Sequence, residues 1–101
     1  MEELIPSEFY LSQNSPNPFR NSTNIKYCLP FKTNVYLTIF NFDGIMVKEL
    51  VNQVQEAGTY EIKFDSHDFP YGEYYFQLQA GDNIKKTKLY FNKMKKMILI
   101  K

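Results

Sequence analysis

The sequence has few of the residues that stabilise small secreted proteins or serve in catalysis. It contains one cysteine, one histidine and no tryptophan among 101 residues. Cys28 has no partner for an internal disulfide, so it leaves the redox compartment undecided and is interpreted as a small strand residue. No apolar run reaches about 18 residues, which predicts that no transmembrane helix is present. The first residues also lack the basic and apolar regions of a secretory leader, which indicates either a cytoplasmic protein or a piece of a longer exported one.

Catalytic and cofactor-binding patterns are equally scarce. The only histidine, His67, follows Ser66 directly. Neighbouring side chains on a strand or turn point apart, so this pair does not form a hydrolase triad. The sequence has no zinc-ligand spacing, no phosphate-binding loop and no dinucleotide fingerprint. We therefore expect a protein that is not an enzyme and needs no cofactor.

Two weak sites remain open at the sequence level. Asp43, Asp65 and Asp68 carry oxygen ligands suited to calcium, but they lack the spacing of a calcium loop, so binding near Asp65 and Asp68 is undecided. Aromatic residues on an exposed strand face suit a sugar-stacking platform, although such residues are more often ordinary strand formers: Tyr36, Phe40 and Tyr75.

Charge is distributed unevenly along the chain. All 11 acidic residues lie at or before Asp82, whereas residues 85–101 contain seven lysines and no acid. Residues 1–84 therefore carry a net charge of −6 and residues 85–101 a net charge of +7. The basic segment has no arginine cluster and no nucleic-acid-binding motif. We interpret it as a solvated strand edge, where lysines discourage edge-to-edge aggregation, and expect no nucleic-acid partner.

What the sequence does contain is a regular alternation of apolar and polar residues with 9 Phe and 8 Tyr. Period-two alternation predicts strands that include residues 25–29, 35–40, 58–64 and 72–80, and a last one through Thr87, Leu89 and Phe91. We expect a polar loop over residues 53–57 and a tight turn over residues 80–83.

Turn signals separate these strands. Asp43-Gly44 predicts a hairpin turn, and the three-residue spacing of Val47 and Leu50 predicts a bulge or a short helical twist. The elements together predict an all-β fold, an immunoglobulin-like antiparallel β-sandwich of about seven strands. The predicted inward-facing residues are Val35, Leu37, Ile39, Tyr60, Ile62, Tyr74, Phe76 and Leu78, with Tyr27 and Phe64 as further aromatic contributors.

The opening string Gln13-Asn-Ser-Pro-Asn-Pro-Phe19, followed by Ile25-x-Tyr-x-Leu-Pro30, resembles the start of type A C-terminal sorting domains of the type IX secretion system. The similarity continues in order and spacing from Phe9 to Gly81. A related immunoglobulin-like domain in the flagellar hook-capping protein shares the turns but lacks this opening. The motif positions are Asn17, Pro18, Phe19, Gly44, Gly58, Tyr60, Gly72, Tyr74 and Gly81.

The resemblance implies a non-catalytic sorting signal. A cargo domain would lie upstream, the precursor would pass through the periplasm, and the outer-membrane translocon would recognise this domain. A sortase commonly removes such domains and leaves the cargo at the cell surface or secreted. Two alternatives stay open: an interaction module of the hook-cap type, and a carbohydrate-binding β-sandwich accessory domain.

The C-terminal end departs from the family pattern. Counted from Ala80, the usual end of the family falls at Lys93, yet residues 94–101 read more like the family terminus than the segment before them. Either the last strand is longer and contains a bulge, or these residues form a tail. We expect a linker in residues 1–8, the domain in 9–93 and a basic strand or tail in 94–101. The residues expected to meet the translocon are Lys93, Lys95, Lys96, Met97, Ile98, Leu99, Ile100 and Lys101.

Overall fold

The computed structural model describes residues 5–83 and 88–101, which form strands and no helix. Thr87, expected to lie in the last strand, and residues 1–4 of the expected linker fall outside the described residues. No described segment is a helix long and apolar enough to cross a membrane. In chain order the strands are β1 (Tyr10–Leu11), β2 (Ser22–Leu29), β3 (Thr33–Asn41), β4 (Met46–Gln55), β5 (Gly58–Asp65), β6 (Gly72–Asn83) and β7 (Lys88–Leu99).

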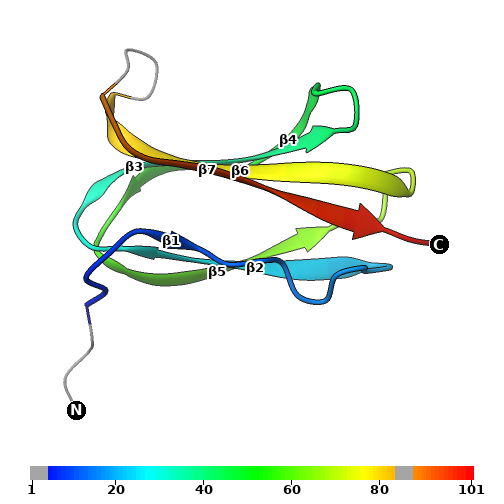
Figure 1. Cartoon of the computed structure of the whole chain (residues 1–101), viewed down its shortest axis with the longest axis horizontal. Coiled ribbons are helices and arrows are strands. Elements are labelled where there is room, and N and C mark those ends of the chain that lie inside the picture. Colours follow the sequence, from blue (N-terminus) through cyan, green and yellow to red (C-terminus); the bar gives the residue numbers. More distant parts are fainter. Residues whose placement is uncertain (1–4, 84–87) are drawn as a thin grey trace.

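The strands form two sheets that face each other as two layers (Figure 1). The smaller sheet has the order β1-β2-β5 and the larger has the order β4-β3-β6-β7, and every pairing within them is antiparallel. This arrangement is the predicted immunoglobulin-like sandwich of seven strands. The strands β4 and β7 are the two edges of the larger sheet.

Strand β2 shows how alternation builds the core. Thr23, Ile25, Tyr27 and Leu29 are buried, and the residues between them are exposed or half-buried. Antiparallel pairing with β5 places Tyr27 opposite Tyr60, and their rings stack with centroids 5.3 Å apart. One face of the strand therefore packs inward while the other stays in water.

The Tyr27 side chain carries its hydroxyl into the core. This hydroxyl donates a hydrogen bond of 2.6 Å to Oε1 of Gln55, which is also buried. Burial raises the pKa of Tyr27 to about 12. The phenol is therefore neutral at any physiological pH, and its polar group is satisfied within the core.

Most of the predicted core is correct. Six of the eight inward-facing residues are buried: Val35, Leu37, Ile39, Tyr74, Phe76 and Leu78. Tyr60 and Ile62 are only partly buried and pack against the outside of this cluster, so their prediction was wrong in degree. Both lie on β5, which is an edge strand, and one flank of an edge strand faces solvent.

The predicted irregularity in the fourth strand is a bulge. Leu37 pairs with Val51 and Thr38 with Glu49, so Leu50 is an extra residue on β4. A second shift between Ile39 and Phe40 makes Val47 extra as well. These are the two residues whose spacing departed from strict alternation. The bulges twist β4 at the edge of the sheet.

One predicted connection, residues 53–57, is shorter than expected, and a second is wrong. Gln53–Gln55 belong to β4, because an edge strand can pair through its backbone while it shows polar side chains to water. Residues 80–83 continue β6, and Gly81 pairs with Leu89 at a register shift. The glycine there marks a β-bulge within the sheet. The turn predicted at that point is absent from the described residues 80–83.

Gly58→Val and Gly72→Val are each expected to lower the free energy of unfolding by about 1–3 kcal/mol. Their φ angles are +152° and +149°, a backbone conformation that residues with a Cβ rarely adopt. A Cβ at Gly72 would meet no atom within 4 Å, so backbone strain and not a clash causes the loss. Thr59→Val, on the adjacent exposed residue, serves as the control in the same thermal melts. Unchanged melting temperatures for both glycine variants would contradict this expectation.

Candidate recognition site at the C-terminal strand

The C-terminal segment is part of the sandwich and not a detached tail. Strand β7 runs without interruption across Lys93 and Met94 to Leu99. The Met97 side chain is fully buried and that of Leu99 is 4% exposed. Their backbones pair with Tyr74 and Gly72 of β6. The longer last strand with a bulge is therefore the arrangement that the structure adopts.

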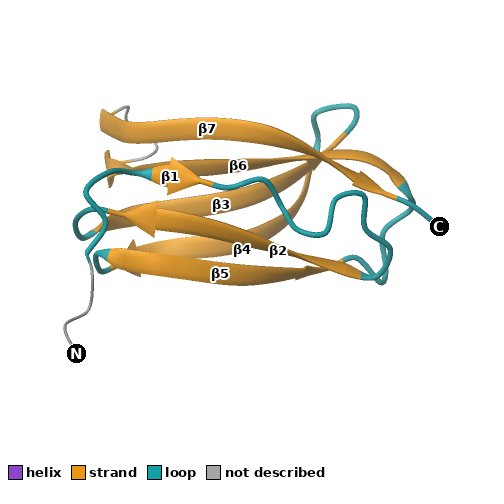
Figure 2. Ribbon diagram, turned by 60° about the horizontal axis from the view of Figure 1, so that its bottom comes forward, coloured by secondary structure: helices purple, strands orange, loops and turns teal. Residues whose placement is uncertain are grey.

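The opening segment (residues 13–20) pairs with the free edge of this strand. The Phe19 N–H donates to the Ile98 carbonyl at 2.9 Å, and the Ile100 N–H donates to the Phe19 carbonyl at 2.8 Å. The pairing is parallel and places Phe19 beside Leu99. Asn17 adds a side-chain bond, because its Oδ1 accepts the Ile98 N–H at 3.0 Å. Figure 2 shows this loop, between β1 and β2, lying next to the end of β7.

Two further side chains of the opening segment contact the terminal residues. Gln13 Nε2 donates to the Lys96 carbonyl at 2.7 Å, and the Arg20 guanidinium donates to the carbonyl of Lys101. The buried Phe19 ring packs edge-on against Phe64 of the smaller sheet, with centroids 6.2 Å apart. The opening segment thus joins the two sheets and holds the chain terminus between them.

A buried polar group fixes the shape of the opening segment. Asn14, 3% exposed, donates from Nδ2 to the Pro16 carbonyl at 3.1 Å and to the Thr23 hydroxyl at 3.0 Å. The Thr23 hydroxyl donates to the same carbonyl at 2.7 Å. Buried polar groups that are all satisfied specify one conformation. Gln13, Asn14 and Thr23 were not singled out by sequence reasoning, although the first two stand inside the quoted opening string.

The turn glycines and tyrosines of the family motif share one geometry. The Tyr60 hydroxyl donates to the carbonyl of Glu56 at 2.7 Å, and the Tyr74 hydroxyl donates to that of Pro70. In each case the tyrosine lies two residues after a positive-φ glycine and bonds four residues back. Each Gly-x-Tyr unit therefore closes its own turn, in the manner of the tyrosine corner of immunoglobulin folds.

A family model described as "Secretion system C-terminal sorting domain" matches residues 15–92. The chain belongs to this family. As a sorting domain it serves the type IX system, which exports proteins across the outer membrane to the cell surface or outside. Comparisons with curated proteins and with solved structures find no significant match. The family match ends before Lys93, so the contacts of the last nine residues come from the structure alone.

The lysines from Lys93 onward lie in solvent or at its margin. Lys93, Lys96 and Lys101 are exposed and Lys95 is half-buried. Lys96 Nζ lies 3.8 Å from a carboxylate oxygen of Glu73, an exposed pair that adds little stability. Ile98 is half-buried and Ile100 is 37% exposed. The predicted recognition residues therefore divide into accessible side chains and the two core residues, Met97 and Leu99.

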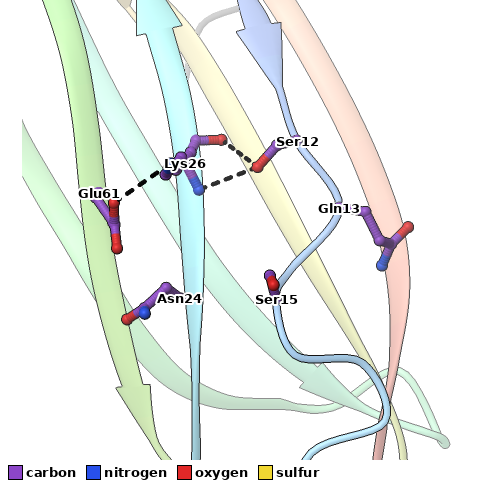
Figure 3. Close-up of a pocket in the computed structure, with 6 residues that line it drawn as sticks. All are labelled: Ser12, Gln13, Ser15, Asn24, Lys26 and Glu61. Carbon is purple, nitrogen blue, oxygen red and sulfur yellow. Dashed lines mark hydrogen bonds and ion pairs between the residues drawn. The ribbon is translucent and has the colours of Figure 1, made fainter.

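A polar hollow opens on the opposite flank of the opening segment (Figure 3). Ser12 Oγ bonds both the carbonyl and the N–H of Lys26, and Lys26 Nζ lies 3.7 Å from Glu61. No aromatic side chain lines this hollow, so it offers no stacking surface for a sugar. The residues that line it are Ser12, Gln13, Ser15, Asn24, Lys26 and Glu61. Tyr36, Phe40 and Tyr75 lie instead on the outer face of the larger sheet.

Two of the other weak candidates, Ser66 and Asp65, make structural bonds. The buried Ser66 hydroxyl reaches the carbonyls of Asn21 at 2.8 Å and of Arg20 at 3.3 Å, which ties the loop after β5 to the opening segment. Asp65 Oδ1 accepts the backbone N–H of the exposed His67. Within residues 5–83 and 88–101, no three histidine, cysteine or acidic side chains gather as a metal site.

Proposed function

We propose that this sorting domain carries an upstream cargo domain across the outer membrane, that the translocon recognises it there, and that a sortase then removes it. The cargo passes through the periplasm on the way. The observation that supports this most is the contact between the family's opening motif and the chain terminus. Asn17 and Phe19 hold Ile98 and Ile100 in one fixed place. A receptor can therefore bind a preformed surface and does not have to order a mobile tail.

The basic side chains of that surface are the proposed contact. Lys93, Lys96 and Lys101 are exposed, and no acidic residue follows Asp82. Complementary charge steers a partner and favours the correct one over others. We therefore assign recognition to Lys93, Lys95, Lys96 and Lys101, with the terminal segment as their support and Ile98 and Ile100 beside them.

A fusion to a periplasmically exported fluorescent protein, in a host with the type IX apparatus, tests this assignment. The wild-type fusion is expected in the medium or on the cell surface. The variant with Lys93, Lys95, Lys96 and Lys101 each changed to glutamine is expected to stay in the periplasm. Cell fractionation and fluorescence of intact cells measure the distribution.

The matched control changes four other lysines to glutamine. Lys26, Lys32, Lys48 and Lys63 are also exposed and lie outside the terminal strand, so this variant has the same net charge. It is expected to be exported like the wild type. Equal export of both variants would contradict recognition through the terminal lysines. Periplasmic retention of the wild-type fusion would contradict the sorting function and favour an interaction module.

A further inference from the structure

Strand β7 has a second stretch of edge that the opening segment leaves free. The bonds of Ile98 and Ile100 to the opening segment show that their backbone groups point away from β6. The N–H and C=O groups of successive residues in an antiparallel strand point to opposite sides. The backbone groups of Asn92 and Met94 therefore point away from β6, like those of Ile98 and Ile100. Among the described residues, none bonds to those two outward-facing backbone positions. The opening segment reaches back only to the Lys96 carbonyl.

An apolar hollow on the outer face of the larger sheet reaches this edge strand at Met94. Phe40, Phe42, Gly44, Tyr75 and Met94 line it. The side chain of Phe42 is 70% exposed and that of Met94 is 49% exposed. A strand added next to Met94 would place an alternate side chain against Met94, at the rim of this hollow, since opposite residues of paired strands share a face.

The charges along the edge select the kind of strand that can pair there. Lys93 and Lys95 flank Met94, and Lys96 follows. A second copy of the chain is disfavoured, because antiparallel self-pairing centred on Met94 sets Lys93 opposite Lys95. If the pairing is centred on Lys93 or on Lys95, that lysine lies opposite the same lysine of the second chain. Like charges directly opposite each other destabilise a strand pair, whereas acidic residues at these positions stabilise it.

We propose that the edge of β7 from Asn92 to Lys96 accepts an extended strand of a partner protein, with acidic residues on both sides of an apolar residue. Backbone bonds to Asn92 and Met94 provide the pairing, Lys93 and Lys95 attract the acidic residues, and the Met94 side chain at the rim of the hollow packs against the apolar residue. The proposal adds a kind of partner to the sorting function. It rests on that function, because export is what brings the domain to the partner.

The probe is an eight-residue synthetic peptide of alternating Glu and Val, added to the isotope-labelled full chain. We expect its binding to shift and protect the amide signals of Asn92 and Met94 in NMR spectra. A peptide of alternating Lys and Val is expected to leave them unchanged. Met94→Pro removes an outward N–H without breaking the ladder to β6, and it should weaken binding about tenfold. Val54→Pro, on the opposite edge strand β4, is the matched control with unchanged binding.

A second variant keeps the backbone intact in case Met94→Pro does not fold. Lys93→Glu with Lys95→Glu should reverse the preference, so that the Lys-Val peptide binds and the Glu-Val peptide does not. Amide shifts at the β4 edge, full binding by Met94→Pro, or a concentration-dependent dimer protected at Asn92 would each overturn the proposal. The fusion assay keeps the two claims separate: export without peptide binding refutes only the edge, and loss of wild-type export refutes only the sorting function.

Discussion

A chain that ends at Lys93 should no longer fold stably. The truncation removes Met97, which is fully buried, and Leu99, whose side chain is 4% exposed. It also removes about half of the residue pairs between β6 and β7. Loss of one buried Met or Leu side chain costs about 2–5 kcal/mol, and two such losses approach the whole stability of a small domain, about 5–15 kcal/mol. Thermal and denaturant unfolding, followed by circular dichroism, are expected to show an unfolded or barely stable chain.

Removal of Lys101 alone is the control for this truncation. It takes away an exposed residue and leaves the core, the pairing of Ile100 and the ladder to β6 in place. The free energy of unfolding should then change by less than about 1 kcal/mol. A chain that ends at Lys93 and melts at the wild-type temperature would show that the terminal strand does not stabilise the sandwich.

This expectation affects how export experiments are interpreted. A truncated fusion that stays in the periplasm would have lost both the fold and the lysines, so its retention would not identify the cause. The lysine-to-glutamine variants leave Met97, Leu99 and the backbone pairing intact, which separates recognition from folding. The same measurements of unfolding, applied to those variants, verify that the fold is retained.

The strands and most of the core could be predicted because their signals are local. Alternation in β3 and β6 assigned the buried faces correctly, and Val47 and Leu50 marked the bulges through their spacing. The errors also have local causes. The polar residues of β4 resemble a loop, because an edge strand pairs on one side only, and Gly81 resembles a turn although it lies at a bulge.

The candidate site could not be predicted in the same way. Asn17 and Ile98 are 81 residues apart, and their bond leaves no periodic pattern in either segment. The resemblance indicated that both the opening string and the terminus belong to one family, but not that they touch. Residues 97–100 are all apolar, so they show no alternation that could favour a continued strand over a tail.

Phe19→Ala should cause the largest loss of stability of any single substitution in the opening segment. The Phe19 side chain is 1% exposed, packs edge-on against Phe64 and lies beside Leu99. Removal of a buried phenylalanine ring costs about 3–5 kcal/mol, through lost burial and the cavity left behind. The substitution removes no backbone group that bonds Ile98 or Ile100, so the loss originates in the missing ring.

Phe42→Ala makes the same chemical change at a residue whose side chain is 70% exposed. It should alter the free energy of unfolding by no more than about 0.5 kcal/mol. Equal losses for the two variants would show that Phe19 does not anchor the opening segment. Because that anchor sets where Ile98 and Ile100 lie, Phe19→Ala should also speed hydrogen exchange at the Ile100 amide. In Phe42→Ala the exchange at this amide is expected to match the wild type. The ring of Phe19 would then link the stability of the sandwich to the position of the terminal strand that we propose is recognised.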